Sequence, residues 1–282
     1  MISIITPTYN RETLLLATIN SILKQSFTDW ELIVVDDGST DGTENMMQKY
    51  LADDRIRYIK KNNTGQAHSL NFGVSYARGA FITFLDSDDE AHSNWLEVVN
   101  SRLKENTGMA CTGAWRKFQD GKVIKEDLIE YDLFGDKLRL KFTCGSLFIN
   151  REVFNIIGGY DSSMKSNIQT DLGYRLVSYL VKTNLKIESI DDNLIQINIH
   201  SGPRIRTNWV NRNEGAIQFL NKHYQFLLKN SKKDIANLCS TIAFSSYKLK
   251  DRKTALYYLA MAIRFSPFRM INYLRVVKYL FV

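Results

Sequence analysis

The first ninety residues alternate between short apolar runs and longer segments with helical spacing. Four runs rich in Ile, Val, Leu and Phe predict buried strands, at residues 2–6, 31–37, 55–60 and 80–86. Segments between them carry apolar or capping residues at helical positions and predict helices, at residues 13–26, 39–51 and 67–77. This alternation indicates a parallel sheet that is covered by helices on both faces.

The pattern loosens after residue 90. We expect helices near Asn94–Glu105 and Asp171–Lys182, and strands near Met109–Phe118, Cys144–Ile149 and Leu185–Ser189. The stretch from about 110 to 145 otherwise reads as a loop. After Pro203 the pattern is helical throughout. The fold class is therefore α/β, and we expect one domain over residues 1–205 and a helical module over residues 206–282.

The helical module contains one repeat-like pair and an amphipathic tail. Ala255, Leu259, Ala262 and Pro267 have the spacing of the second helix of a tetratricopeptide unit, although no second copy is visible. On a helical wheel, residues 268–282 place Arg269, Asn272 and Arg275 away from an apolar face made of Met270, Tyr273, Leu274, Val277, Leu280 and Phe281. Such a face suits a membrane interface or the core of the module, and both interpretations stay open.

The charge is unevenly distributed along the chain. From Pro203 onward, 15 Lys and Arg face three acids, whereas the first 202 residues carry 22 basic and 27 acidic side chains. A basic module favours an anionic partner such as a lipid headgroup, and the alternative is an ordinary solvated surface. No known nucleic-acid-binding module is visible, so we expect no nucleic acid as a partner.

Cysteine content and hydropathy indicate the compartment. Cys111, Cys144 and Cys239 are few, odd in number and far apart, which is typical of reduced thiols in a cytosolic protein. No run of about 18 or more apolar residues is present, so we expect no membrane-spanning segment. The predicted location is the cytoplasm, with peripheral contact at the inner face of the cell membrane.

Polar side chains gather where three of the predicted strands end. The first strand is followed by "PTYNR", the second ends at Asp36 and Asp37, and the fourth ends at Asp86 and Asp88. In a parallel sheet these ends share one edge, where ligands bind. An Asp-x-Asp pair on extended chain directs both carboxylates to one side, where they can hold Mg²⁺ or Mn²⁺ beside phosphate oxygens. Glycosidases also use two carboxylates, but they need no such phosphate contacts.

Five motifs occur in a fixed order. They are "PTYNR" (Pro7–Arg11), "VVDDGSTDGT" (Val34–Thr43), "NNTGQAHSLNFG" (Asn62–Gly73), "ARGAFITFLDSDDE" (Ala77–Glu90) and "FNIIGGYD" (Phe154–Asp161). As a set they resemble the family 2 glycosyltransferases, which have the GT-A fold, over residues 1–205. The resemblance implies an inverting, metal-dependent transfer from a nucleotide diphosphate-sugar, with UDP expected, to a hydroxyl of a glycan or lipid-linked acceptor in bacterial surface polysaccharide synthesis.

The resemblance also implies roles for individual residues. Donor contacts would come from Thr6, Tyr9, Arg11, Asp36, Asp37, Asn71 and Asp86, with Arg204 and Arg206 on the diphosphate. Asp88 would bind Mn²⁺ or Mg²⁺ directly, helped by Asp86 and by His200. Asp171, at the start of a helix, matches the catalytic base; alternatively it is a first-turn acid favoured by the helix dipole.

Two positions depart from the family pattern. Leu70 stands where many relatives have an arginine, and Lys61, His68 or Arg78 could supply the lost contact. Thr170 replaces a glutamate that often precedes the base. A nucleotidyltransferase and a non-catalytic scaffold are the alternative functions. A nucleotidyltransferase would need a glycine-rich loop after the first strand, which "PTYNRETL" lacks, and a non-catalytic scaffold would act through the helical module.

Overall fold

The structure, a computed structural model, describes residues 1–133, 136–200 and 208–281. It divides into two compact units, each made of several chain segments. Unit 1 contains residues 1–131, 137–162 and 169–201, and unit 2 contains residues 132–136, 163–168 and 202–282. Unit 2 thus also contains two short segments from the first part of the chain. The domain boundary near residue 205 stays a prediction.

Unit 1 is built on a mixed sheet with the strand order β3-β2-β1-β4-β10-β6-β11-β5, and β7 pairs with β6. Its strands are β1 (Ile2–Thr8), β2 (Trp30–Asp36), β3 (Ile56–Lys60), β4 (Phe81–Phe84), β5 (Glu90–Ala91), β6 (Thr107–Phe118), β7 (Val123–Glu126), β10 (Leu147–Asn150) and β11 (Lys186–Ile199). The four strands predicted within residues 1–90 are parallel neighbours, and β11 is parallel to β6. β10 runs antiparallel to both β4 and β6. The predicted α/β fold is confirmed.

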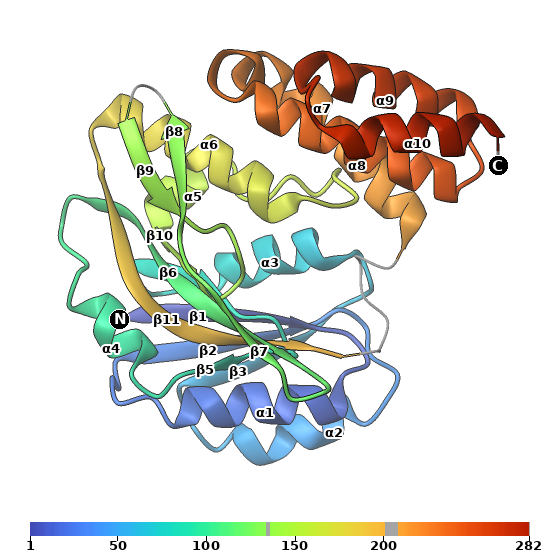
Figure 1. Ribbon diagram of the computed structural model, residues 1–282. Coiled ribbons are helices and arrows are strands. Elements are labelled where there is room, and N and C mark those ends of the chain that lie inside the picture. Colours follow the sequence, from blue (N-terminus) through green and yellow to red (C-terminus); the bar gives the residue numbers. More distant parts are fainter. Residues whose placement is uncertain (134–135, 201–207, 282) are drawn as a thin grey trace. The chain divides into compact units, whose positions relative to one another are not determined.

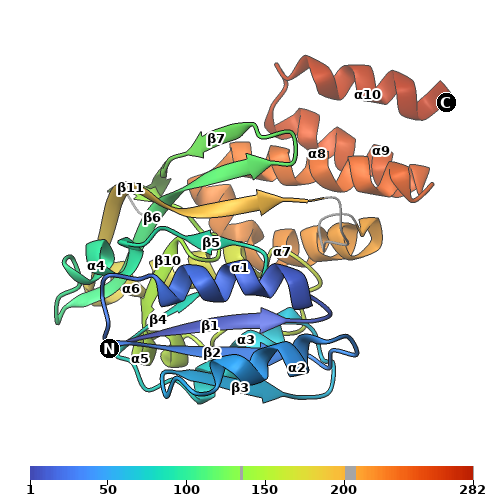
Figure 2. The same ribbon diagram turned by 90° about the horizontal axis from the view of Figure 1, so that it is seen from below.

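Helices cover both faces of this sheet (Figures 1 and 2). The helices of unit 1 are α1 (Glu12–Leu23), α2 (Thr43–Met47), followed by a short 3₁₀ turn at Gln48–Tyr50, α3 (Gln66–Ser75), α4 (Trp95–Asn100), α5 (Arg151–Ile156) and α6 (Ile168–Thr183). Successive side chains along a strand point to opposite faces of the sheet and contact different helices. Ile4 belongs to the same core cluster as Ile19 of α1, whereas Ile5 lies against Gly73 of α3 so closely that a Cβ on Gly73 would lie 2.5 Å from the side chain of Ile5.

The segment expected as a loop is more regular than predicted. β6 continues into a hairpin with β7, and β8 (Ile129–Leu133) pairs with β9 (Asp136–Leu140) as a separate two-stranded sheet. β8 and β9 carry many charged residues, but Ile129, Tyr131 and Leu133 alternate with acids and Leu138 and Leu140 flank Arg139, so the alternation of a half-exposed hairpin was present in the sequence and was overlooked. The predicted helix near Asn94–Glu105 is shorter, and it ends at Asn100.

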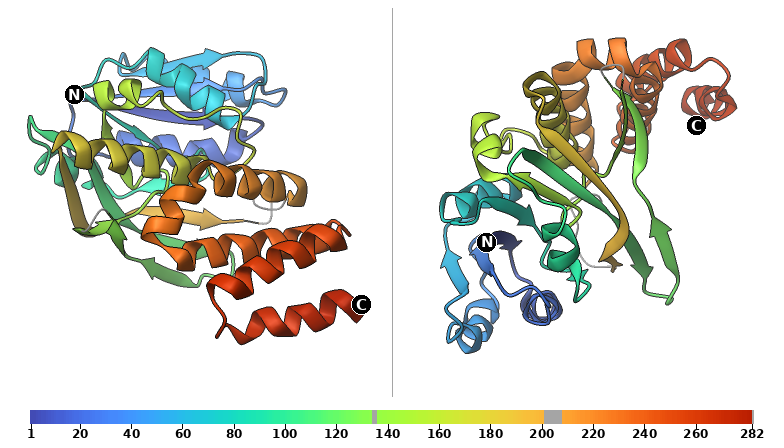
Figure 3. Two further views of the ribbon diagram at one scale, coloured as in Figure 1. Left: turned by 90° about the horizontal axis from the view of Figure 1, so that it is seen from above. Right: turned by 90° about the vertical axis from the view of Figure 1, so that its left-hand side faces the viewer.

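Unit 2 is helical in its long C-terminal segment, as predicted (Figure 3). Its helices are α7 (Trp209–Asn230), α8 (Lys232–Lys248), α9 (Arg252–Phe265) and α10 (Met270–Phe281). Ala255, Leu259 and Ala262 of α9 are fully buried, in agreement with their repeat-like spacing. In the described part of the chain, every helix is too short or too polar to cross a membrane.

The tail helix α10 packs with the opposite face from the one its apolar pattern suggests. Asn272, predicted to point away, is fully buried and accepts a hydrogen bond from Ser240 of α8 at 3.1 Å, while Tyr279 stacks on Tyr247. The apolar face is exposed by 41 to 70% at Met270, Tyr273, Leu274, Val277 and Leu280; the side chain of Phe281 lies outside the described part. The core interpretation of this face is therefore wrong.

Candidate active site

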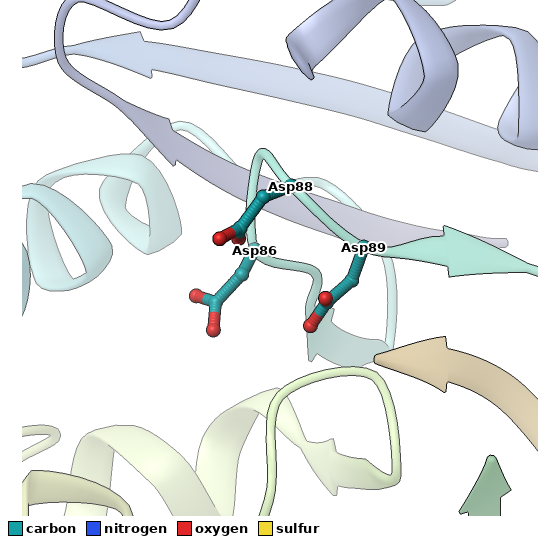
Figure 4. A group of neighbouring side chains, drawn as sticks. All are labelled: Asp86, Asp88 and Asp89. Atoms are coloured by element: carbon teal, nitrogen blue, oxygen red, sulfur yellow. The ribbon is translucent and has the colours of Figure 1, made fainter. Parts of the chain in front are cut away.

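Three carboxylates leave one tight turn just beyond the end of β4 (Figure 4). The backbone N–H of Asp89 donates to the carbonyl of Asp86 at 3.1 Å, which closes the turn. One carboxylate oxygen from each of Asp86, Asp88 and Asp89 lies within 4.8 Å of the others, and we call these residues the acid cluster. The expectation of an extended Asp-x-Asp pair is wrong, because the turn and not the strand repeat brings the acids together.

Asp88 is contacted by two basic side chains from distant parts of the sequence. Arg11 Nη1 and His200 Nε2 each lie 2.7 Å from Asp88 Oδ2, and they lie 3.4 Å from each other. Arg11 follows the end of β1, and His200 follows β11. The strand ends therefore bring together three residues that the sequence predicts for this site, and the positive charge of Arg11 offsets part of the repulsion within the acid cluster.

Two amide side chains that the sequence reading missed hold the rest of the cluster. Gln66 Nε2 donates to Asp86 Oδ1 at 3.0 Å. The backbone N–H of Asn198 donates to Asp89 Oδ1 at 2.9 Å, and its side chain donates to the carbonyl of Asp88 at 2.9 Å. Asn198 lies two residues before His200, so strand alternation was the signal that could have placed it beside the site.

The predicted nucleotide-side residues differ in exposure. Tyr9 is 48% exposed, whereas Thr6 and Asp36 are fully buried. Asp36 Oδ1 accepts from the backbone N–H of Ser39 at 2.7 Å, and its Oδ2 accepts from the hydroxyl of Tyr58. Burial and this hydrogen bond raise the pKa of Tyr58, so the phenol stays protonated and donates. Asp36 thus braces the end of β2 in this structure, and its donor contact stays a prediction.

Asp37 fixes the loop that leads into α3. Its carboxylate forms an ion pair with Lys61 and accepts from the backbone N–H groups of Thr64 at 2.9 Å and Gly65 at 2.8 Å. Burial opposes ionisation of Asp37, but these donors outweigh it and hold its pKa below the ordinary value. Lys61, considered as a substitute for the arginine absent at Leu70, is therefore engaged with Asp37.

Asn71 connects α3 to the Gly158–Asp161 turn. Its Nδ2 donates to the carbonyl of Tyr160, and its Oδ1 accepts from the N–H of Tyr160, both at 2.8 Å. This pairing engages both polar atoms of the amide, and the predicted donor contact of Asn71 stays a prediction. Arg78 pairs with Glu31 at the start of β2, at the opposite end of the strand from Asp36, so it does not replace the missing arginine contact.

Asp171 lies in the first turn of α6 with no exposed surface. Its Oδ2 accepts from Arg175 Nε at 2.9 Å and from Arg175 Nη2 at 2.7 Å. Arg175 also donates to the carbonyls of Ile157 at 2.8 Å and Gly159 at 2.7 Å. The Asp171–Arg175 pair therefore ties α6 to the glycine turn, and the role of Asp171 as base stays a prediction. Arg204 and Arg206 lie outside the described residues.

A cavity of about 430 Å³ opens beside the start of α6. Its walls are formed by Arg116, Glu126, Asp127, Ile129, Tyr131, Lys141, Phe142, Thr143 and Thr170. Glu126 pairs with Arg116 at 2.7 Å and with Lys141 at 3.1 Å, which fixes charged groups in the wall. The volume lies within the range of small-molecule sites, about 300–1,000 Å³.

Known glycosyltransferases resemble this chain in sequence. It is 31% identical over 204 residues to the Staphylococcus aureus poly(ribitol-phosphate) beta-N-acetylglucosaminyltransferase TarP, a match that covers 62% of each chain. It is 32% identical over 158 residues to the Escherichia coli UDP-Glc:alpha-D-GlcNAc-diphosphoundecaprenol beta-1,3-glucosyltransferase WfgD, covering 55% of this chain and 62% of the relative. For an uncharacterized Rickettsia felis glycosyltransferase the match spans only 21% of the relative's length.

Solved structures share the fold at lower identity. S. aureus TarS residues 1–349 in complex with UDP-GlcNAc superpose with a TM-score of 0.63 at 20% identity, covering 94% of this chain and 88% of TarS. The Pyrobaculum calidifontis mannosyltransferase PcManGT, in complex with GDP-Man and Mn²⁺, gives 0.57 at 17% identity, covering 99% and 79%. The sequence model described as glycosyl transferase family 2 matches residues 3–162, more than half of the chain. The chain therefore belongs to glycosyl transferase family 2.

Proposed function

We propose that this glycosyltransferase moves a sugar from a nucleotide diphosphate-sugar, with UDP as the expected nucleotide, to a hydroxyl of a glycan or lipid-linked acceptor in cell-surface polysaccharide synthesis. The observation that carries the proposal is the acid cluster with Arg11 and His200 at the strand ends of a family 2 fold. The names of TarP and WfgD, and the UDP-GlcNAc bound to TarS, support this class of donor and product.

The acid cluster fits Mn²⁺ or Mg²⁺ as a cofactor. Its carboxylate oxygens are the hard ligands that these ions prefer, and His200 adds an imidazole nitrogen that Mn²⁺ accepts. Asp88, Asp86 and His200 would hold the ion, with Asp89 nearby. When bound, the ion would neutralise the charge that develops on the departing diphosphate. The Mn²⁺ in PcManGT supports this assignment by fold analogy alone.

The chain's own cations would bind the donor phosphates. The guanidinium of Arg11 lies 2.7 Å from Asp88, and such a group can donate two parallel hydrogen bonds to phosphate oxygens. Arg204 and Arg206 follow His200 in the sequence and are proposed to add to this role.

Inversion at the anomeric carbon requires a base on the acceptor side, opposite the diphosphate. Asp171 is our proposed base, and its pair with Arg175, formed through Oδ2, favours the ionised carboxylate that a base requires. The acceptor is proposed to enter the cavity beside Thr143 and Thr170, where Tyr131 and Phe142 offer aromatic walls and the ion pairs of Glu126 offer fixed donors and acceptors.

We also propose peripheral membrane contact on the cytoplasmic side through unit 2. The apolar face of α10 is exposed, and the chain from Pro203 onward carries 15 Lys and Arg against three acids. Arg269 and Arg275 themselves bond to Asn237 and Ser240 of α8, so the basic groups of this surface come from the other residues of unit 2. Apolar and basic groups in this arrangement favour an interface with anionic lipids. Such contact would bring the enzyme to a lipid-linked acceptor.

Calorimetric titration with UDP, GDP, CMP and dTDP, each with and without Mn²⁺, tests the function. We expect UDP to bind, with an affinity that rises when Mn²⁺ is added. Asp88→Ala should remove the metal-dependent part of the binding and abolish transfer while the unfolding temperature stays within a few degrees, because relief of the repulsion within the acid cluster offsets the loss of the pair with Arg11. Failure of all four nucleotides to bind would instead favour a non-catalytic scaffold that acts through its helical unit.

A further inference from the structure

The cavity beside the start of α6 contains three charged side chains in which two cations share one carboxylate. Arg116 Nε donates to Glu126 Oε1 at 2.7 Å, and Lys141 Nζ donates to Glu126 Oε2 at 3.1 Å. We call these residues the cavity triad. Asp127, the other acid in the described wall of the cavity, pairs with Lys125 at 2.9 Å. The cavity triad therefore carries an excess positive charge that the described wall residues do not balance.

Main-chain pairing builds the cavity triad. In the pairing of β6 with β7, Glu126 lies opposite Ala114, and Arg116 follows two residues later on the same side of β6. Diagonal neighbours of this kind lie about 7–8 Å apart, within reach of long side chains. Lys141 directly follows β9, which belongs to the separate two-stranded sheet. The hairpin thus fixes Arg116 and Glu126, and Lys141 reaches the same carboxylate from another pair of strands.

The carboxylate of Glu126 is ionised at neutral pH. Burial opposes its ionisation, but the hydrogen bond from Arg116 and the charge of Lys141 outweigh this effect and hold the pKa of Glu126 below its ordinary value. Its single negative charge is therefore divided between the two cations.

Most N–H donors of the two cations are unused within the structure. A guanidinium and an ammonium each offer several donors. In the described part of the chain, Glu126 is the only side chain that accepts from Arg116 or from Lys141. Lys141 is nevertheless buried, and a buried ammonium is costly unless acceptors surround it. The hydroxyl of Thr143, in the same wall, also has no hydrogen-bond partner among the described residues.

We propose that the cavity triad binds an anionic group of the acceptor, a phosphate or a carboxylate, between Arg116 and Lys141. This inference rests on the proposed function for placing the acceptor in this cavity. The remaining edge of a guanidinium can donate two parallel hydrogen bonds to an oxyanion, and an ammonium adds a point charge beside it. A neutral sugar would leave the excess charge unbalanced. The acceptor class is therefore an acidic glycan.

The cavity triad shares its cavity with the start of α6. Thr170, which precedes the proposed base Asp171, is part of the cavity wall. Tyr131 and Phe142, whose ring centroids lie 5.9 Å apart, form an aromatic part of the same wall. An anion held by the cavity triad would therefore belong to the part of the acceptor that lies beside this helix, and it would select the acceptor before transfer.

The test measures the binding of small probes to the full chain, without nucleotide or metal, by ligand-observed NMR titration. Glycerol 3-phosphate and glucuronate are the anionic probes, and glycerol and glucose are their neutral counterparts. We expect an anionic probe to bind roughly tenfold more tightly than its neutral counterpart, because hydrogen bonds to charged groups are stronger than neutral ones. A preference for glycerol 3-phosphate would identify a phosphate-bearing acceptor, and a preference for glucuronate would identify an acidic sugar.

Three variants assign this binding to the cavity triad. Lys141→Met should weaken the anionic probe roughly tenfold and leave the neutral probe unchanged. Glu126→Gln should strengthen anion binding several-fold, because the carboxylate that competes for the two cations is then neutral, and a loss of packing would not produce this rise. Lys137→Met is the matched control, because Lys137 also lies in β9 but is 75% exposed and lies outside the described cavity wall.

Equal affinities for anionic and neutral probes in the wild type would overturn the proposal. Equal anion affinities in Lys141→Met and the wild type would overturn it as well, and so would an equal loss in Lys137→Met. UDP titration separates this proposal from the proposed function. UDP should bind Lys141→Met and the wild type alike, and a parallel loss of UDP affinity would place the donor diphosphate in the cavity and overturn the assignment to the acceptor. If the wild type binds no UDP, the proposed function falls and the anion site is judged by the probes alone.

Discussion

Replacing Asp171 by Asn decides whether this carboxylate mainly stabilises the fold or serves as the base. The change keeps the size of the side chain and one acceptor atom, but it removes the negative charge opposite Arg175. Breaking a fully buried ion pair by removing one partner costs about 3–5 kcal/mol. Here the side chain of Arg175 is 21% exposed and keeps its bonds to the carbonyls of Ile157 and Gly159. We therefore expect a loss of about 2–3 kcal/mol in the free energy of unfolding.

The assay is urea unfolding, with thermal unfolding as a second measure. For a unit of roughly 200 residues this loss should lower the unfolding temperature by about 5–10 °C. Asp191→Asn is the matched control, because Asp191 pairs with Arg139 at 2.7 Å while 67% of its side chain is exposed. An exposed pair contributes about 0–1 kcal/mol, so the control should unfold nearly as the wild type does.

If Asp171→Asn unfolds as the wild type does, binds UDP and Mn²⁺ normally and yet loses turnover, the ion pair contributes little and Asp171 acts chiefly as the base. If stability falls as expected while turnover at a temperature below unfolding is retained, the base must be another group.

Three further changes test other parts of the structure. In co-sedimentation with phosphatidylglycerol vesicles, Leu274→Asp should lower binding roughly tenfold, the cost of losing one buried apolar side chain, whereas the same change at exposed Val123 in unit 1 should not. Glu31 is buried among donors from Ser3, Arg57 and Arg78, which lower its pKa despite the opposing effect of burial. The stability that ionised Glu31 contributes to the fold is complete above the unfolded-state pKa of about 4.3 and is lost as the pH falls through the folded-state pKa. Glu31→Gln should therefore make the free energy of unfolding depend less steeply on pH in the acid range, as measured by circular dichroism. Gly145→Ala should lower the free energy of unfolding in urea by about 2–4 kcal/mol, because the new Cβ would clash with Ile195 in addition to straining the backbone. Gly121→Ala is the control, because Gly121 has a φ of +83° and a Cβ there would meet nothing within 4 Å. An equal loss of stability in the two variants would contradict this reasoning.

The N-terminal strands and the polar residues at their ends could be predicted from local sequence patterns. β1, β2 and most of β4 are buried on both faces, so their apolar runs are continuous and readable, whereas β3 at the sheet edge is mostly half-buried. Parallel pairing then brings Arg11, Asp88 and His200 to one edge, although they are far apart in sequence. Asp86, Asp88 and Arg11 could therefore be placed at this edge from residue types and strand ends, whereas His200 was placed there only by the family resemblance, because the predicted strand near Leu185–Ser189 stops ten residues short of the end of β11.

Orientation around a helix could not be predicted in the same way. The periodicity of α6 indicates a helix, but the burial of Asp171 depends on its pair with Arg175, which is held in place by the carbonyls of Ile157 and Gly159. In α10 the apolar stripe predicts amphipathicity, yet the docked face is chosen by Ser240 and Tyr247 of α8.

The interleaving of the two units bears on how this architecture can change over evolutionary time. Within unit 2, Lys165 donates its N–H to Gln218 of α7 at 3.0 Å, and Gln218 in turn donates to the carbonyl of Ser163 at 3.2 Å. A gene fusion or exchange that replaced everything after residue 205 would leave the segment 163–168 without the surface it was selected to pack on. The helical unit is therefore expected to be inherited together with its glycosyltransferase domain, and the two to diversify jointly and not by recombination of separate modules.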